Sequence, residues 1–311
     1  MLRGNRFWIV LCASLAGPLV FAQTAKPAST EHVLIGILDD AREEMVNWMP
    51  GVAGDRIIRP AFEKTKAGWR KVEPVSIPTQ INWTVAFNGR SLGQIAGKAI
   101  PNGSKPKEGS SRYLTAVQAI VTPPTAIPSV GAPSEKYSPL ATGPTKGRRP
   151  LVVISKPYTS DPDGWKRLSQ PPETISSRIL EAFRKDFPHA CRCKEEKIVQ
   201  HNWKFPDSAL NFPTTYASNK DTFLVESNLN AGDCGYVDDP NEADSSPWYF
   251  VTADGHARRI GSFLSLLDAG DYDNEGRSEV IFILEQPEDT EGFVLFDADM
   301  HKAASLLWEY H

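Results

Sequence analysis

The carboxy-terminal half of the chain consists of short apolar segments separated by turns rich in aspartate, asparagine and glycine. Such segments, rich in valine, isoleucine, phenylalanine and tryptophan, are typical of β-strands. Short strands at this spacing favour a sandwich, a barrel or propeller-like blades, but no clean repeat period establishes a full propeller. We expect strands at residues 197–205, 222–227, 248–252, 257–262, 280–284, 293–296 and 304–310.

The amino-terminal half carries fewer strand signals, of which one hairpin is the clearest. Asn88 and Gly89 favour the positive φ values of a type I′ turn, and strand-like segments at 83–87 and 90–95 flank them. Further strands are expected at 31–39, 57–62, 66–72, 113–121 and 150–155.

One segment shows a clear helical period. Apolar residues recur near a spacing of 3.6 over residues 173–187, and Pro188 ends the pattern. The predicted fold is therefore mainly β with one or two helices, built from short antiparallel strands in a sandwich or propeller-like arrangement, with an α+β fold as the alternative.

The amino terminus has the pattern of a secretory signal peptide. Arg3 and Arg6 precede an apolar run over residues 7–21, and small residues lead to an expected cleavage after Ala22. The run is shorter than the roughly 20 residues that span a bilayer, so we expect no stable membrane span after cleavage. These features predict a secreted or periplasmic protein.

The rest of the chain divides at a proline-rich stretch. We expect a β-rich part at 23–121, a flexible loop at 122–149, and a second β-rich part at 150–311. The two β-rich parts form either one domain or two. The formal charge of −4 becomes −6 once the two arginines of the signal are removed, which argues against nucleic acid as a partner.

Three cysteines remain after the signal: Cys191, Cys193 and Cys234. In an oxidising compartment we expect Cys234 to pair with Cys191 or Cys193 and to leave the other free. The alternative is a zinc site that adds His189 or His201, although the spacing lacks the paired CxxC knuckles of structural zinc sites.

The strongest candidate site is an acidic loop directly before the strand expected at 280–284. Asp271, Asp273, Glu275 and Glu279 occupy loop positions one, three, five and nine, and Gly276 permits a sharp turn at position six. Oxygen ligands in this arrangement are what calcium prefers. An EF-hand would need an acid at position twelve, where Phe282 stands, so the loop is not an EF-hand.

The loop resembles the calcium loops of FG-GAP repeats, which occur in integrin-type β-propellers and many bacterial secreted proteins. The resemblance covers roughly residues 268–284. It implies that Asp271, Asp273, Glu275 and Glu279 are side-chain ligands and that Arg277 offers its backbone carbonyl. Glu275 departs from the pattern, because aspartate or asparagine is usual there. From residue 248 onward the chain is also similar to bacterial extracytoplasmic proteins that pair such a loop with a closing strand.

Other residues give weaker signals for chemistry. Ser91 lies in a Gly-x-Ser-x-Gly pattern, but a nucleophile elbow needs a strand, a sharp turn and a helix, whereas a hairpin is expected here. His256 is expected in an exposed turn. The numerous tryptophans could form a carbohydrate-binding face, although a β-core uses them more often.

The sequence thus predicts a binding or structural module braced by structural calcium, with a protein or a carbohydrate as its partner. An extracytoplasmic hydrolase, whose active site assembles only in the fold, is the alternative.

Overall fold

The structure is a computed structural model, and it describes residues 32–40, 56–73, 78, 80–87, 89–98, 118–120, 150–156, 160–195, 197–232, 246–285 and 290–309. All of these residues belong to one compact unit that spans His32–His311. The predicted signal peptide, the proline-rich loop at 122–149 and Cys234 lie outside the described residues.

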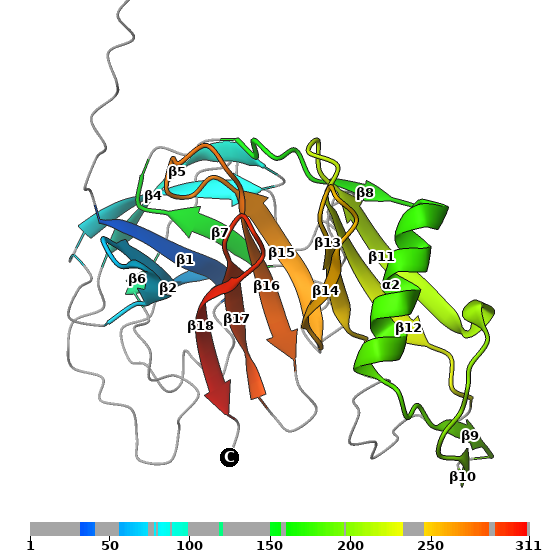
Figure 1. Cartoon of the computed structure of the whole chain (residues 1–311). Coiled ribbons are helices and arrows are strands. Elements are labelled where there is room, and N and C mark those ends of the chain that lie inside the picture. Colours follow the sequence, from blue (N-terminus) through cyan, green and yellow to red (C-terminus); the bar gives the residue numbers. More distant parts are fainter. Residues whose placement is uncertain are drawn as a thin grey trace, which may run out of the picture. The chain divides into compact units, whose positions relative to one another are not determined.

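The amino-terminal half supplies a seven-stranded antiparallel sheet (Figure 1). Its strands follow the order β3-β2-β1-β7-β4-β5, and β6 also pairs with β2. A Cβ atom at Gly36 would lie only 2.7 Å from Cγ2 of Ile58, so the side chains around this part of β1 leave no room for a larger residue. The bounds are β1 Val33–Asp40, β2 Arg56–Thr65, β3 Gly68–Lys71, β4 Gln80–Phe87, β5 Arg90–Lys98, β6 Gln118–Ile120 and β7 Leu151–Ile154.

The carboxy terminus folds into a four-stranded antiparallel meander, β15-β16-β17-β18. Six of the seven residues of β16 are buried, which means that the strand is covered on both faces. The bounds are β15 Leu264–Gly270, β16 Glu279–Glu285, β17 Thr290–Phe296 and β18 Lys302–Glu309.

A third sheet of five strands has the order β14-β13-β12-β11-β8. Helix α2 packs on it, because Ile179 and Phe183 on its apolar face join a core with Val225 and Tyr249. The bounds are β8 Lys166–Leu168, α2 Glu173–Asp186, β11 Leu210–Ala217, β12 Phe223–Leu229, β13 Trp248–Val251 and β14 Ala257–Gly261; β9 Arg192–Lys194 and β10 Lys197–Gln200 form a separate hairpin, and Asp207–Ala209 is a short 3-10 helix.

Alternate residues of the four-stranded sheet enter two different cores. Ile281 and Leu295 pack with residues of the seven-stranded sheet, such as Phe62. Val280 and Phe282, on the opposite face, pack with residues of the five-stranded sheet. Since side chains alternate across a strand, this one sheet joins the packing of the other two.

The predicted mainly-β fold of short antiparallel strands is confirmed, and the packed sheets are sandwich-like. The expected helix is α2, and the expected hairpin is β4 with β5, where Gly89 has a φ of 68°. Strands β8, β9, β11 and β15 lie outside the segments expected as strands. The strand expected at 197–205 ends at Gln200, because Phe205 leaves the hairpin and packs against Phe183 of α2.

The sequence pattern did not predict strand β15, because Ser265 and Asp268 interrupt its apolar run. In the structure Asp268 is nevertheless buried and accepts a hydrogen bond from the hydroxyl of Tyr272 at 3.2 Å. A hydrophobicity pattern therefore does not predict this strand, because a polar residue lies in its buried part. No helix in the described part of the chain is both long and apolar enough to cross a membrane.

Phe282 tests the importance of the double burial. Its ring lies 5.2 Å from that of Trp248 and 5.5 Å from that of Phe296, measured between centroids. We expect Phe282→Ala to lower the free energy of unfolding by about 3–5 kcal/mol, because it leaves a cavity in this core. Urea denaturation measures this loss. The control is Leu307→Ala on β18, whose side chain is 43% exposed and whose loss should stay below about 1 kcal/mol; equal losses would contradict the described packing.

Candidate metal site

The acidic loop connects two neighbouring strands of the doubly covered sheet. Strand β15 ends at Gly270 and β16 begins at Glu279, and Gly270 and Glu279 face each other in the ladder. Asn274 and Gly276 take positive φ values of 64° and 83°. This backbone conformation is the one that the glycine at position six predicts, since glycine adopts it without steric cost.

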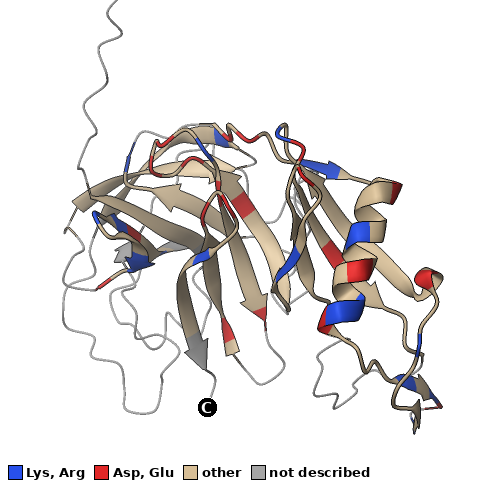
Figure 2. Ribbon diagram, viewed as in Figure 1, with Lys and Arg blue, Asp and Glu red and all other residues tan. Residues whose placement is uncertain are grey.

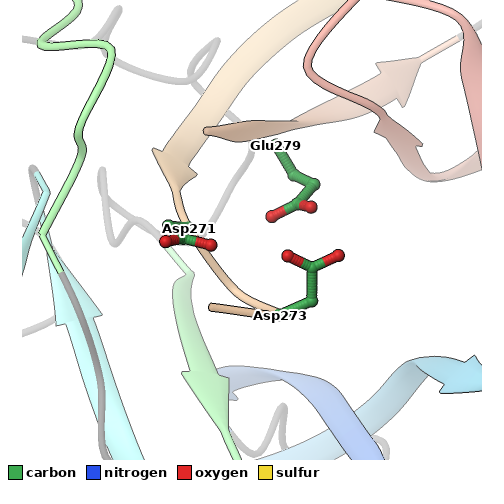
Figure 3. Close-up of side chains that lie close together, drawn as sticks. All are labelled: Asp271, Asp273 and Glu279. Atoms are coloured by element: carbon green, nitrogen blue, oxygen red, sulfur yellow. The ribbon is translucent and has the colours of Figure 1, made fainter. Parts of the chain in front are cut away.

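The fold brings three of the predicted ligands together. Asp271, Asp273 and Glu279 each place a carboxylate oxygen within 4.8 Å of the others. Figure 3 shows the carboxylates of Asp273 and Glu279 facing each other, with that of Asp271 beside them. Asp271 is 6% exposed, Glu279 is 5% exposed, and the side chain of Asp273 is 3% exposed. Three acidic groups are therefore held close together away from solvent.

Backbone N–H groups of the loop orient these carboxylates. The amide of Gly276 donates to Asp271 Oδ2 at 2.8 Å, and that of Glu275 donates to Asp273 Oδ1 at 3.1 Å. The amide of Tyr272 donates to Glu279 Oε2 at 2.9 Å. Backbone amides of the loop thus position the carboxylates of Asp271, Asp273 and Glu279.

Glu279 and Asp271 resist ionisation where they lie. Burial, followed by the nearby charge of Asp273, raises the pKa of Glu279 well above its usual range. Burial also raises the pKa of Asp271, although the hydrogen bond from the Gly276 amide opposes this. Desolvation and like charges both disfavour a carboxylate, and a cation among the three groups would remove that cost.

A lysine from another sheet reaches the loop. Lys64 of β2 places its Nζ 2.5 Å from Asp273 Oδ2 and 3.3 Å from Glu275 Oε1. Burial alone would lower the pKa of Lys64, but the hydrogen bonds and charges of Asp273 and Glu275 together raise it. Lys64 therefore supplies one positive charge to the acidic loop. Nothing in the sequence near residue 64 signals this contact, because 209 positions separate the two partners.

The two remaining predicted ligands lie differently. The side chain of Glu275 is 69% exposed, and its Oε1 lies 3.3 Å from Lys64 Nζ. The side chain of Arg277 turns away to donate to the backbone carbonyl of Ala298 at 3.1 Å, and Asp299 Oδ1 lies 2.9 Å from the same Nη2. A role for Glu275 or for the Arg277 carbonyl as a metal ligand stays a prediction.

Neighbouring segments hold the loop at both ends. Tyr272 is fully buried in the core between the four-stranded and seven-stranded sheets. Ser278, also fully buried, donates to Asp161 Oδ1 at 2.6 Å and accepts from the amide of Asp163 at 3.2 Å. The loop is thus joined to the segment that leads into β8. Position twelve, Phe282, packs inside the core as part of β16, which is incompatible with an EF-hand ligand.

The weaker candidates lie elsewhere. Ser91 is an exposed residue of β5, in the returning strand of a hairpin, so the strand-turn-helix geometry of a nucleophile elbow does not form around it. His256 is exposed in the turn between β13 and β14, where its amide donates to Thr252 Oγ1. Trp83, Trp165 and Trp248 are buried in cores, as the interpretation of the tryptophans as core residues predicts.

The structure describes Cys191 and Cys193 but not Cys234. Cys191 is buried, and its Sγ lies 3.8 Å from His201 Nδ1. Which of Cys191 and Cys193 pairs with Cys234 stays a prediction, because Cys234 lies outside the described residues. Among the residues that the structure describes, the only group of histidine, cysteine and acidic side chains close enough to share a metal is the acidic loop.

Comparison of the chain with models of known protein families, with curated proteins and with solved structures finds no match in any of the three. The interpretation of the site therefore depends on its own geometry.

Ser278 tests how the loop is held. We expect Ser278→Ala to lower the free energy of unfolding by about 1–3 kcal/mol, because it removes a buried hydroxyl that both donates and accepts. Urea denaturation checks this loss against Ser177→Ala, an exposed serine whose hydroxyl donates to the Glu173 carbonyl in α2. If both variants cost the same, the contact between Ser278 and Asp161 does not anchor the loop.

Proposed function

We propose that the protein is an extracytoplasmic binding or structural module whose acidic loop binds calcium as a structural brace. The observation that supports this proposal most directly is the convergence of Asp271, Asp273 and Glu279 within 4.8 Å. The three carboxylates come from a single loop that connects two strands of the doubly covered sheet. A cation at this place would fix the loop against the end of that sheet.

The donor set favours calcium over other common ions. All three side chains offer hard oxygen atoms, and no cysteine or histidine joins them among the described residues, whereas zinc prefers nitrogen and sulfur ligands. Magnesium demands near-ideal octahedral geometry and keeps several waters, while calcium accepts mixed carboxylate, carbonyl and water ligands in a flexible loop. Glu275 and the Arg277 carbonyl are the further donors that the FG-GAP resemblance proposes.

The expected role of the ion is mechanical. It would neutralise acids that burial makes costly to ionise, and it would hold Ser278 and Arg277 at the positions from which they contact neighbouring segments. Secretion or periplasmic location, where calcium is plentiful, supports the same proposal and follows from the predicted signal peptide. A protein or a carbohydrate is the proposed class of partner, whereas the hydrolase alternative gains no specific support from the positions of Ser91 and His256.

Calcium dependence of stability tests the site. We expect millimolar calcium to raise the thermal midpoint of the wild type above its value in EGTA, because a ligand of the native state stabilises it by about 2.7 kcal/mol at a hundredfold excess over the Kd. Asp271→Asn should abolish most of this rise. Glu181→Gln is the matched control, since it removes an acid that is 78% exposed on α2, and it should keep the full rise. A wild type that melts equally in calcium and EGTA would refute the site.

Lys64 offers an independent test of how the loop is neutralised. We expect Lys64→Met to lower the free energy of unfolding in EGTA by about 1–3 kcal/mol, because Asp273 loses its charged partner away from solvent. Calcium should stabilise this variant more than the wild type, since the ion no longer competes with an ammonium for Asp273. Chemical denaturation with and without calcium measures both quantities. An equal calcium effect in the two proteins would show that Lys64 and the ion do not share carboxylates.

A further inference from the structure

A pocket of about 280 Å³, lined mostly by charged and polar residues, lies beside the acidic loop. Turns from two sheets line it: the β11–β12 and β13–β14 connections of the five-stranded sheet, and the β17–β18 turn of the four-stranded sheet. Arg277 of the acidic loop also lines it. Binding sites for small molecules commonly measure roughly 300–1,000 Å³. This pocket lies at the lower end of that range, so we expect a ligand no larger than a monosaccharide.

Two guanidinium groups in the pocket are held by one turn. Arg277 Nη2 donates to the carbonyl of Ala298 and lies 2.9 Å from Asp299 Oδ1, while Arg258 Nη2 donates to the carbonyl of Asp299 at 2.5 Å. Arg258 also lies over the ring of Phe250, 5.5 Å from its centroid. Each guanidinium is thereby fixed at one end, and five N–H donors per group leave others for a ligand.

The charges of the pocket are not balanced by its own acids. Lys220, Arg258 and Arg277 line it together with two carboxylates, Asp163 and Asp299. Lys220 pairs with Asp163, and Arg277 pairs with Asp299. Within the described part of the chain Arg258 pairs with no carboxylate; it donates to the backbone carbonyl of Asp299 and lies over the ring of Phe250.

The other titratable group in the pocket is His301. Its Nδ1 lies 3.7 Å from Asp297 Oδ2, outside the lining, and its side chain is 70% exposed. Figure 2 shows basic and acidic residues together on α2 and in the turns, whereas the strands consist mostly of other residues.

We propose that this pocket binds a small ligand through an oxyanion group, either a carboxylate or a phosphate, with Arg258 as the principal anchor and Arg277 as the second. Guanidinium groups suit such ligands because their planar forks donate two parallel hydrogen bonds to two oxygens. The inference deepens the proposed function, since it gives the binding module a ligand class, but it does not require that calcium binds.

The position of Arg277 connects the pocket with the acidic loop. Its backbone belongs to the loop between Asp271 and Glu279, while its side chain reaches the β17–β18 turn. A brace on the loop would therefore also fix one of the two anchors of the oxyanion.

Titration of the full mature chain with four probes tests the proposal: inorganic phosphate, glucuronate, glucose 6-phosphate and the neutral control glucose. Calorimetry at about 150 mM salt limits unspecific attraction, because exposed charges are then screened beyond about 8 Å. We expect saturable binding of at least one anionic probe and none of glucose. The probe that binds distinguishes a carboxylate from a phosphate.

Variants then locate the binding. Arg258→Gln should weaken it about tenfold or more, because it removes a charge-assisted pair, and Arg277→Gln serves as a second variant if the first fails to fold. The matched control is Arg192→Gln on β9, since Arg192 lies over Trp203 at 5.4 Å as Arg258 lies over Phe250, but outside the pocket. It should bind as the wild type does.

Three results would overturn the proposal. The first is that no anionic probe binds at about 10 mM, a concentration that would detect even weak binding. The second is that Arg192→Gln weakens probe binding as much as Arg258→Gln does, and the third is that both pocket variants bind the probe as the wild type does. Each titration is repeated in EGTA and in calcium. If calcium does not stabilise the wild type but a probe still binds, the brace alone is refuted. If calcium stabilises the wild type but no probe binds, the pocket alone is refuted.

Discussion

The burial of one four-stranded sheet on both of its faces is the constraint on which the rest of this structure depends. Even-numbered residues of β16, such as Phe282, pack toward the five-stranded sheet, and odd-numbered ones, such as Ile281, pack toward the seven-stranded sheet. A slip of one residue in this strand would exchange the two sets of side chains. The register of β15 with β16 is therefore fixed by two cores at once, and so is the point where the connecting loop begins.

This rigidity explains how a short loop can hold three acids away from solvent. The ladder ends at Gly270 and Glu279, and the packing of Tyr272 and Ser278 leaves the intervening turn little freedom. The carboxylate oxygens of the loop converge, and their burial raises the pKa values of Asp271 and Glu279. Lys64, which reaches in from the seven-stranded sheet, pairs with Asp273 of the same loop. The same loop places Arg277 in the neighbouring pocket, so one stretch of chain serves both the proposed brace and the proposed anion site.

Patterns within short stretches of the sequence predicted the elements that depend on neighbouring residues. The period of residues 173–187 predicted α2, and Asn88–Gly89 predicted the β4–β5 hairpin. The odd-numbered acids and Gly276 predicted the turn in which Asp271, Asp273 and Glu279 converge. Long-range features escaped prediction for a physical reason. The contact of Lys64 with Asp273 and the joining of Arg258 with Arg277 at one turn depend on how separate sheets pack, and no short window of sequence contains both partners.

Hydrogen exchange of the mature protein, followed by mass spectrometry in calcium and in EGTA, tests the central claim most directly, because it locates the effect of the ion on the chain. If the loop is a calcium brace, calcium slows exchange in residues 271–278, in the attached segment at 160–164 and in the turn at 297–301, while α2 exchanges at the same rate in both conditions. Equal exchange across residues 271–278 with and without calcium, or slowing spread evenly over the chain, would contradict the account.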